Sequence, residues 1–434
     1  MKWSGKCQSC GTWNSLSEEA VEQTAKGKKS YSPVSNTEPT SLSQLTAGTE
    51  IRYHSGFDEL NRVLGGGIVK GSLILLGGDP GIGKSTLLLQ MCGRINKAFK
   101  ALYISGEESA GQIKLRADRL GINSENIYIL SETNAESIVA AIEKMKPSLV
   151  IVDSIQTIYT ENASTSAGSV SQIKESAAVL MRCAKTNEIP VFLVGHVTKE
   201  GNIAGPKVLE HTVDVVLYFE GDEKTQYRIL RSAKNRFGTT SEIGVFEMRS
   251  DGLGEIKNPS AEFISDSQSE VSGTVIGCLF EGSRPILCEL QSLVSKSPFP
   301  SPRRMAIGAD YGRLCMLIAV LEKRAGLLLY DNDVYLNVAG GLSLNETSAD
   351  LAVILSLASC VKDFVIGNDT VIIGEVGLSG EVRGVSNIDV RLSEAYRLGF
   401  KKAVVPAKCK ITATLGDMEI IRVRNVREAI RFFL

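Results

Sequence analysis

Short apolar segments alternate with longer amphipathic stretches between about residues 45 and 258. Apolar runs of this length predict buried strands, and the stretches between them predict helices that cover a mostly parallel sheet. The strands are expected at 73–76, 101–105, 127–130, 149–153, 191–194, 215–219 and 227–232. The helices are expected to begin near Ser85, Ser109, Asn134, Ser171 and Pro206. Residues 45–258 therefore predict an α/β domain.

A second apolar block extends over residues 273–434, beyond a polar segment at 259–272 that we interpret as an interdomain linker. It mixes predicted strands and helices, which indicates an α/β or α+β domain. The strands are expected at 274–280, 287–294, 335–338, 371–374 and 402–405, and the helices at 311–325, 348–361 and 390–398. Residues 15–44 are dominated by Ser, Thr, Lys and Glu and predict a flexible linker behind a small module at 1–14.

Composition limits the class of protein. With 434 residues the chain exceeds the size at which one hydrophobic core keeps growing, so more than one domain is expected. Lys and Arg number 48 against 49 Asp and Glu, so any nucleic acid must be bound by local basic patches. No apolar run could span a bilayer and no signal segment is recognisable, so we expect a cytoplasmic protein without a membrane partner. The nine cysteines fit reduced thiols better than disulfides.

A glycine-rich run lies between the strand expected at 73–76 and the helix expected from Ser85. It matches G-x-x-x-x-G-K-[ST], the phosphate loop of nucleoside triphosphatases, whose backbone N–H groups turn towards a phosphate. Lys84 would neutralise the β- and γ-oxygens, and the Ser85 hydroxyl would bind magnesium. We therefore expect ATP and Mg²⁺ as cofactors. The expected ATP-binding residues are Gly78, Asp79, Pro80, Gly81, Ile82, Gly83, Lys84, Ser85 and Thr86.

Two acidic positions follow predicted strands of the same sheet. Asp153 ends the strand at 149–153 and is the expected second ligand of magnesium. Glu107 follows the strand at 101–105, where it would open beside the nucleotide and orient the attacking water. Glu108 is the second choice for that role; alternatively, it only favours the N-terminus of the next helix.

These motifs occur in an order that resembles the RecA-like ATPases. After the phosphate loop come Glu107-Glu108, Val152-Asp153-Ser154, Leu193-Val194-Gly195-His196 and Lys234-Asn235-Arg236-Phe237-Gly238. The last five residues resemble the signature of the RadA family, also called Sms, and the resemblance extends over the whole chain. It implies a hexameric, ATP-driven motor that moves on single-stranded DNA. Such a motor extends branched recombination intermediates by branch migration, together with RecA.

The resemblance also assigns roles to individual residues. Lys234 and Arg236 are expected to lie at a neighbouring subunit's ATP, as an arginine finger would, and to contact DNA. Two like charges on one strand face are costly unless an anion lies opposite, although a solvated basic strand end is the alternative. His196 occupies the position of a polar γ-phosphate sensor; a satisfied core imidazole is its alternative.

Two loops rich in Gly, Ser and Thr follow predicted strands, at 158–170 and 199–207. In RecA-like rings such loops face the central channel. Lys199, Lys207 and the backbone amides would then follow DNA phosphates without reading bases. The alternative is a pair of ordinary surface loops.

Cys7 and Cys10 form a single Cys-x-x-Cys pair. A four-cysteine zinc site needs two such pairs, and the resemblance expects the other just upstream of residues 2–6. We therefore interpret Cys7 and Cys10 as ligands of a truncated, degraded zinc site. Zn²⁺ is expected only if the missing pair is restored, and contact with RecA is in doubt.

The second block resembles the proteolytic domain of Lon, through residues 374–382 and the segment around Ser348. Lon cleaves peptides with a Ser-Lys dyad, but residues 387–391 contain no lysine, and Arg391 is the expected occupant of that position. A guanidinium stays protonated and cannot take the proton of Ser348. We expect a proteolytically inactive domain that holds the ring together. Arg303 and Arg304 are its candidate DNA contacts, although a basic pair beside prolines is more often a plain solvated loop.

Three functions remain open. A DNA-stimulated motor ATPase is favoured by residues 234–238. A RecA-like signalling ATPase would hydrolyse ATP at a rate indifferent to single-stranded DNA. An ATP-dependent protease, the least favoured, would cleave peptides in a manner that depends on Ser348.

Overall fold

The computed structural model describes residues 51–96, 98–123, 125–196, 208–221, 226–262, 264 and 271–434. The predicted cysteine module and its linker fall outside these residues, as do Lys199 and Lys207. The chain divides into two compact units, and all the described residues belong to the second, Glu50–Leu434. Among them there is no helix with the length and apolar character of a membrane span.

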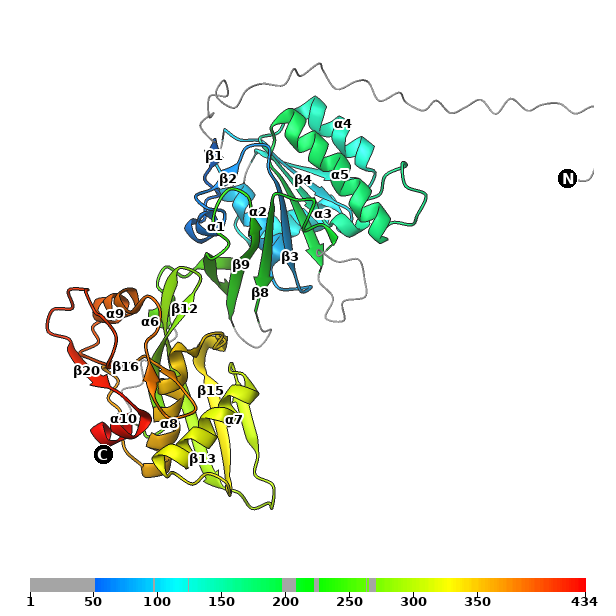
Figure 1. Cartoon of the computed structure of the whole chain (residues 1–434). Coiled ribbons are helices and arrows are strands. Elements are labelled where there is room, and N and C mark those ends of the chain that lie inside the picture. The colour runs from blue at the N-terminus through cyan, green and yellow to red at the C-terminus, as the bar shows by residue number, and fades with distance from the viewer. Residues whose placement is uncertain are drawn as a thin grey trace, which may run out of the picture. The chain divides into compact units, whose positions relative to one another are not determined.

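A nine-stranded sheet forms the first block (Figure 1). Its strand order is β11-β10-β9-β8-β3-β7-β6-β4-β5, parallel from β8 to β5 and antiparallel from β8 to β11. All seven predicted strands are present, and two more extend the antiparallel side. The strands are β3 Leu73–Gly78, β4 Ala101–Ser105, β5 Ile127–Ser131, β6 Leu149–Asp153, β7 Val191–His196, β8 Val215–Glu220, β9 Tyr227–Asn235, β10 Ile243–Arg249 and β11 Gly252–Glu255. A separate pair, β1 Arg52–Tyr53 and β2 Ile68–Val69, flanks the short helix α1 Asp58–Val63.

Four helices cover the parallel part of the sheet: α2 Lys84–Arg94, α3 Ala110–Arg119, α4 Ala135–Met145 and α5 Val170–Asn187. Their starts follow from local chemistry, because Ser109, Asn134 and Ser169 each accept a hydrogen bond at a helix N-terminus. The apolar sides of α2 and α3 pack on one face of the sheet, and those of α4 and α5 on the other. Figure 1 shows α4 and α5 side by side.

A seven-stranded mixed sheet forms the second block, in the order β14-β15-β13-β12-β16-β19-β20. The strands are β12 Thr274–Glu281, β13 Arg284–Lys296, β14 Arg304–Ile307, β15 Asn332–Val338, β16 Thr370–Ile372, β19 Lys402–Pro406 and β20 Glu419–Val423. A small hairpin pairs β17 Glu375–Val376 with β18 Val382–Arg383. The helices are α7 Tyr311–Val320, α8 Asp350–Lys362, α9 Ile388–Arg397 and α10 Val426–Phe433. The first ten residues of α8 are buried, so this helix forms the centre of the domain.

The predicted linker 259–272 begins with structured residues. Pro259–Glu262 forms the short helix α6, and Ser260 is buried. The Ser260 hydroxyl accepts a hydrogen bond from the Leu287 backbone N–H of β13 and donates to Glu394 of α9. These contacts attach the start of the segment to the second sheet.

Candidate nucleotide-binding site

The site lies at the carboxyl ends of four parallel strands. The register pairs Gly78 of β3 with His196 of β7, and Ser105 of β4 with Asp153 of β6. Because these ends meet at one edge of the sheet, the loops that follow them converge there. They enclose a pocket of about 270 Å³. Its lining residues are Gly81, Gly83, Lys84, Ser85, Thr86, Ser105, Glu107, Glu108, Arg116, Arg119, Asp153 and His196.

The phosphate loop turns tightly between β3 and α2. Gly83, with φ 115°, is the N-cap of α2, a backbone conformation that favours glycine. A Cβ at Gly83 would lie 2.8 Å from Met248 Cε, and one at Gly78 would lie 2.5 Å from the Phe219 carbonyl oxygen. Ile82, 4% exposed, packs into the core instead of lining the pocket. The tight turn therefore needs its glycines, and Ile82 anchors it.

Of the nine residues expected to bind ATP in this loop, Gly78, Asp79, Pro80 and Ile82 do not line the pocket. Gly78 and Asp79 act on it through Lys84, whose Nζ donates a hydrogen bond of 2.8 Å to each of their carbonyl oxygens. Lys84 is 4% exposed. Burial lowers the pKa of Lys84 to about 8, although the carboxylates of Asp153, Asp79 and Glu107 act in the opposite direction. Its ammonium thus gains strongly from an anion in the pocket.

Ser85 and Asp153 fit a magnesium ion. A hydroxyl at the start of α2 and a carboxylate at the end of β6 line the same pocket, and both offer the hard oxygen atoms that magnesium prefers. Asp153 Oδ2 accepts a hydrogen bond of 2.5 Å from the Tyr103 hydroxyl. Burial raises the pKa of Tyr103 well above its usual value, and the charge of Asp153 adds to this, so the hydroxyl is the donor. Magnesium usually takes one or two protein carboxylates and completes its shell with water and phosphate.

Glu107 and His196 meet at the mouth of the pocket. The Ser154 hydroxyl donates to Glu107 Oε1, and His196 Nε2 lies 3.5 Å from the same oxygen. The Glu107 side chain is 45% exposed, while the buried His196 Nδ1 has no hydrogen-bond partner within the described part of the chain. Gly106 permits this placement, because a Cβ there would lie 2.0 Å from Thr157 Oγ1. Glu107 can therefore reach a water molecule beside a bound nucleotide.

Arg116 and Arg119 were missed by the sequence analysis. Arg116 Nη2 donates to Glu108 Oε1, whereas the buried Arg116 Nη1 has no hydrogen-bond partner among the residues that the structure describes. Both arginines lie on α3, three residues apart, so they share the side of the helix that faces the pocket. The only sequence signal for them is their spacing of three residues on the helix expected to begin near Ser109, which places both on one side of that helix.

Lys234 and Arg236 do not line this pocket of their own chain. Lys234 Nζ donates to the carbonyl oxygens of Glu210 and Val213, each at 2.8 Å. Arg236 Nη1 lies 3.2 Å from Asp214 Oδ1. Burial lowers the pKa of Lys234, and the charge of Arg236 adds to the effect. The sequence analysis expected an anion opposite the positive charges of Lys234 and Arg236. Within this chain, that anion is the carboxylate of Asp214.

Comparison with known proteins identifies the family. Residues 38–202 match a family model described as an AAA domain. DNA repair protein RadA of Bacillus subtilis is 51% identical over 99% of this chain and 95% of that protein. RadA of Halalkalibacterium halodurans is 50% identical over 100% and 96%, and RadA of Listeria monocytogenes 47% over 99% and 94%. The chain belongs to the RadA family of DNA repair proteins.

Family membership confirms the resemblance drawn from residues 234–238 and the predicted fold class. This RadA-family chain has a RecA-like P-loop ATPase core, followed by an α/β domain of the Lon-protease-like type. Families of P-loop ATPases generally use ATP and Mg²⁺, which agrees with the oxygen donors of the pocket. No cluster of metal-binding His, Cys, Asp or Glu side chains occurs among the residues the structure describes. The zinc prediction falls on Cys7 and Cys10, outside them.

In the second domain, Ser348 is buried beside Arg391 and Glu346. Arg391 is 0% exposed, and its Nη1 donates to Ser348 Oγ at 3.1 Å, to Glu346 Oε1 at 2.7 Å and to the Cys278 carbonyl oxygen at 2.7 Å. The Ser348 hydroxyl in turn lies 2.6 Å from Glu346 Oε1. Burial acts to raise the pKa of Glu346, but hydrogen bonds from Arg391 and Ser348 lower it overall. The Ser348 hydroxyl thus donates to a carboxylate that is already paired with Arg391, and the Arg391 guanidinium cannot accept the serine proton.

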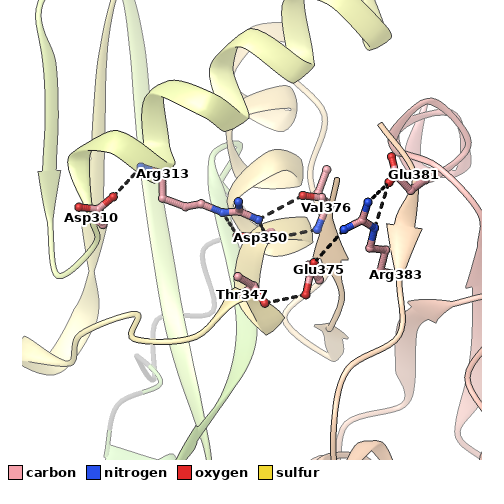
Figure 2. A network of polar contacts seen from close by, with 8 residues as sticks. All are labelled: Asp310, Arg313, Thr347, Asp350, Glu375, Val376, Glu381 and Arg383. Carbon is pink, nitrogen blue, oxygen red and sulfur yellow. Dashed lines mark hydrogen bonds and ion pairs between the residues drawn. The ribbon is translucent and has the colours of Figure 1, made fainter. Parts of the chain in front are cut away.

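The segment around Ser348 is fixed by further polar contacts (Figure 2). Arg313 of α7 points to Asp350 at the start of α8, and Asp350 also accepts a hydrogen bond of 3.1 Å from the Val376 backbone N–H. Thr347 Oγ1 donates to Glu375 at 2.9 Å. A neighbouring pocket, lined by Leu314, Leu317 and Val353 among others, has a volume of about 30 Å³. That volume is large enough to hold a water molecule.

Arg303 and Arg304, the candidate DNA contacts, differ in their surroundings. Arg303 is exposed, and its guanidinium lies 5.3 Å from the centre of the Phe299 ring. Arg304 donates to the backbone carbonyl oxygens of Leu329 and Asn332. The Arg304 guanidinium therefore holds a turn of its own domain, and of the two arginines Arg303 is the one open to a phosphate.

Proposed function

We propose that this chain is a DNA-stimulated ATPase motor of homologous recombination and DNA repair. It works as a hexameric ring that moves on single-stranded DNA and promotes branch migration together with RecA, in the cytoplasm. One observation carries the proposal: a RadA-family chain brings Lys84, Asp153 and Glu107 into a single pocket. The repair role rests on the relatives, which are described as DNA repair proteins.

For ATP hydrolysis, we assign a separate role to each group of residues in the pocket. Lys84 binds the β- and γ-phosphate oxygens, and Ser85 and Asp153 hold the metal, which neutralises charge that develops on the phosphates. Glu107 orients the attacking water. Its Oε1 accepts a hydrogen bond from Ser154 and lies near His196 Nε2. Arg116 lines the same pocket, its buried Nη1 has no partner among the described residues, and it contributes positive charge to the phosphates.

Coupling between subunits is assigned to Lys234 and Arg236, which act at a neighbour's ATP. Arg236 is 56% exposed and extends from the end of β9, so it can reach beyond its own chain. DNA contacts are assigned to the loop 158–170 and to Lys199, Lys207, Lys234, Arg236 and Arg303. The loop is held at its base, because the buried Gln172 side chain binds the backbone of Thr160, Ala163 and Thr165.

The second domain is proposed to be proteolytically inactive. A Ser-Lys dyad requires a base that accepts the serine proton, and Arg391 cannot serve as one. Ser348 is 2% exposed, which also separates it from a peptide in solution. The domain instead stabilises the ring.

The test is ATP hydrolysis by the full chain with and without single-stranded DNA across a salt series, with Lys84→Ala as the inactive control. We expect stimulation that declines steeply with salt, because contacts to phosphates release counterions. A rate of ATP hydrolysis that is the same with and without single-stranded DNA at every salt concentration would contradict the motor and favour the signalling ATPase. Cleavage of a fluorogenic peptide that is lost in Ser348→Ala would instead support the protease.

A further inference from the structure

Tyr103 lies behind the nucleotide pocket and does not line it. It is 1% exposed and belongs to strand β4, which lies between β6 and the edge strand β5. Side chains two apart on a strand share a face, so Tyr103 and Ser105 project to the same side of β4. The register sets Tyr103 beside Ile151 and Ser105 beside Asp153. Asp153 is two residues beyond Ile151 on β6, so the Tyr103 side chain extends along the strand direction. Its hydroxyl lies 2.5 Å from Asp153 Oδ2.

We propose that Tyr103 is a positioning residue that orients Asp153 as the magnesium ligand. Ligating carboxylates are commonly held by outer hydrogen bonds, and loss of such a bond typically costs 10–100-fold in metal affinity. The bond at Oδ2 fixes the rotation of the carboxylate and hence the direction of its other oxygen. Because the ring is packed in the core of the sheet, it supplies this donor from a rigid position. The proposal rests on the ATP site of the proposed function and is independent of DNA.

The carboxylates of the pocket receive different partners, which supports distinct roles. Asp153 accepts from a buried phenol, while Glu107, which is 45% exposed, is held by the hydroxyl of Ser154 and approached by His196. Glu108 pairs with Arg116. A metal ligand benefits from a fixed orientation, whereas a group that orients water must follow a reacting molecule. The tyrosine partner therefore distinguishes the metal ligand from the water-orienting residue.

The simpler alternative is that the buried hydroxyl only needs an acceptor, as buried tyrosines usually do. The chain offers a matched control for this alternative. Tyr218 of β8 donates to Glu210 Oε1 at 2.7 Å, and neither residue lines the pocket. Tyr103→Phe and Tyr218→Phe thus remove the same tyrosine-carboxylate hydrogen bond inside and outside the nucleotide site.

The experiment is a Mg²⁺ titration, started in EDTA, of the binding of a fluorescent ADP analogue to the full chain without DNA. For Tyr103→Phe we expect the Mg²⁺ concentration at half-effect to rise about tenfold or more, with nucleotide affinity in EDTA unchanged. Tyr218→Phe should follow the wild type. A wild-type Mg²⁺ dependence in Tyr103→Phe, or an equal shift in both variants, overturns the proposal. Thermal unfolding of both variants reports any loss of folding.

A double-mutant cycle supplies a second test that does not depend on one variant. In Asp153→Asn the metal affinity is already weak, so adding Tyr103→Phe should change it less than about twofold. A full additional loss would mean that Tyr103 acts elsewhere and would overturn the proposal. Wild-type protein that does not bind the nucleotide would contradict the ATP site of the proposed function, and binding with no response to Mg²⁺ would contradict its metal site, which separates these failures from that of the Tyr103 proposal.

Discussion

Arg236 and Asp214 form an ion pair within one chain, with Arg236 Nη1 3.2 Å from Asp214 Oδ1. The two side chains are unequally exposed: 56% for the arginine and 2% for the aspartate. Asp214 Oδ2 also accepts hydrogen bonds from Lys185 Nζ at 2.7 Å and from the Leu73 backbone N–H at 3.0 Å. The buried carboxylate therefore keeps a counter-ion without Arg236, and the arginine can turn to another anion at modest cost.

If Arg236 acts at a neighbour's ATP, two inactive variants should complement each other. Lys84→Ala and Arg236→Ala are each expected to lose ATP turnover. In mixed rings, some interfaces combine the intact Lys84 of one subunit with the intact Arg236 of the next, so turnover should partly return. The measurement is ATP hydrolysis against mixing ratio. Lys185→Met, which also removes one partner of Asp214, should retain turnover. No recovery in rings proven to be mixed would contradict action between subunits.

ATP affinity should fall as pH rises above about 8. The pKa of Lys84 is lowered to about 8 by burial, and only its protonated form neutralises a phosphate. Above this pKa, binding must first protonate the amine, which costs up to about tenfold in affinity per pH unit until the pKa of the complex is reached. Nucleotide binding in EDTA, measured from pH 6.5 to 9.5, tests this. Lys84→Ala should bind the nucleotide weakly at every pH and should not show the fall in affinity above about pH 8. The same fall in that variant would mean that another group titrates.

Arg116→Ala should weaken ATP binding or slow its turnover by about tenfold or more. The reason is that Arg116 lines the pocket with a buried donor that no described residue pairs with, and hydrogen bonds to charged groups are worth about 1.5–3 kcal/mol. Lys114→Ala is the matched control, since Lys114 lies on the same helix, pairs with Asp118 and is absent from the pocket. Steady-state kcat and KM for ATP measure both effects. Equal behaviour of the two variants would make Arg116 only the partner of Glu108.

Arg391→Lys should neither create a peptidase nor preserve stability. An ammonium beside Glu346 is favoured in its charged form, so it would not take a proton from Ser348. Lysine also loses the bidentate contact of the guanidinium with Glu346. Arg391→Met, which leaves Glu346 without its partner, should cost about 3–5 kcal/mol of unfolding free energy. Urea unfolding and a fluorogenic peptide assay measure these outcomes. Peptide cleavage by Arg391→Lys would show that the rest of a dyad site is intact.

The apolar pattern predicted all the strands in the parallel part of the first sheet. The strand expected at 101–105 agrees with β4 to the residue, and the one at 149–153 agrees with β6. Among the strands of the two large sheets, β10, β11, β14 and β20 were not predicted, and helix α10 was not predicted either. Strand β14 lies at the edge of its sheet and pairs only with β15, so its local pattern is weak. In β14, for example, Met305 and Ile307 are exposed while the alternate residues are half-buried.

The residues of the candidate site were predicted in part, and the reason that others were not predicted is physical. Lys84, Asp153 and Glu107 follow apolar strands and carry chemistry that a pattern can identify. Arg116 lies two turns into an amphipathic helix, where an arginine is usually solvated. Tyr103 is a single aromatic residue within a buried strand, and nothing local distinguishes it from a core phenylalanine.

The sequence by itself determined the phosphate loop, the acidic residues at strand ends, the absence of a lysine near Arg391 and the signature at 234–238, because these depend on residue type and short spacing. Only the tertiary structure decided their partners. The register of β4 and β6 places Tyr103 near Asp153. The packing of α3 places Arg116 beside Glu108. The fold of the chain places Arg236 beside Asp214. Those pairs join residues 8 to 50 positions apart. Contacts at such separations depend on how strands align and helices pack, which no local pattern specifies.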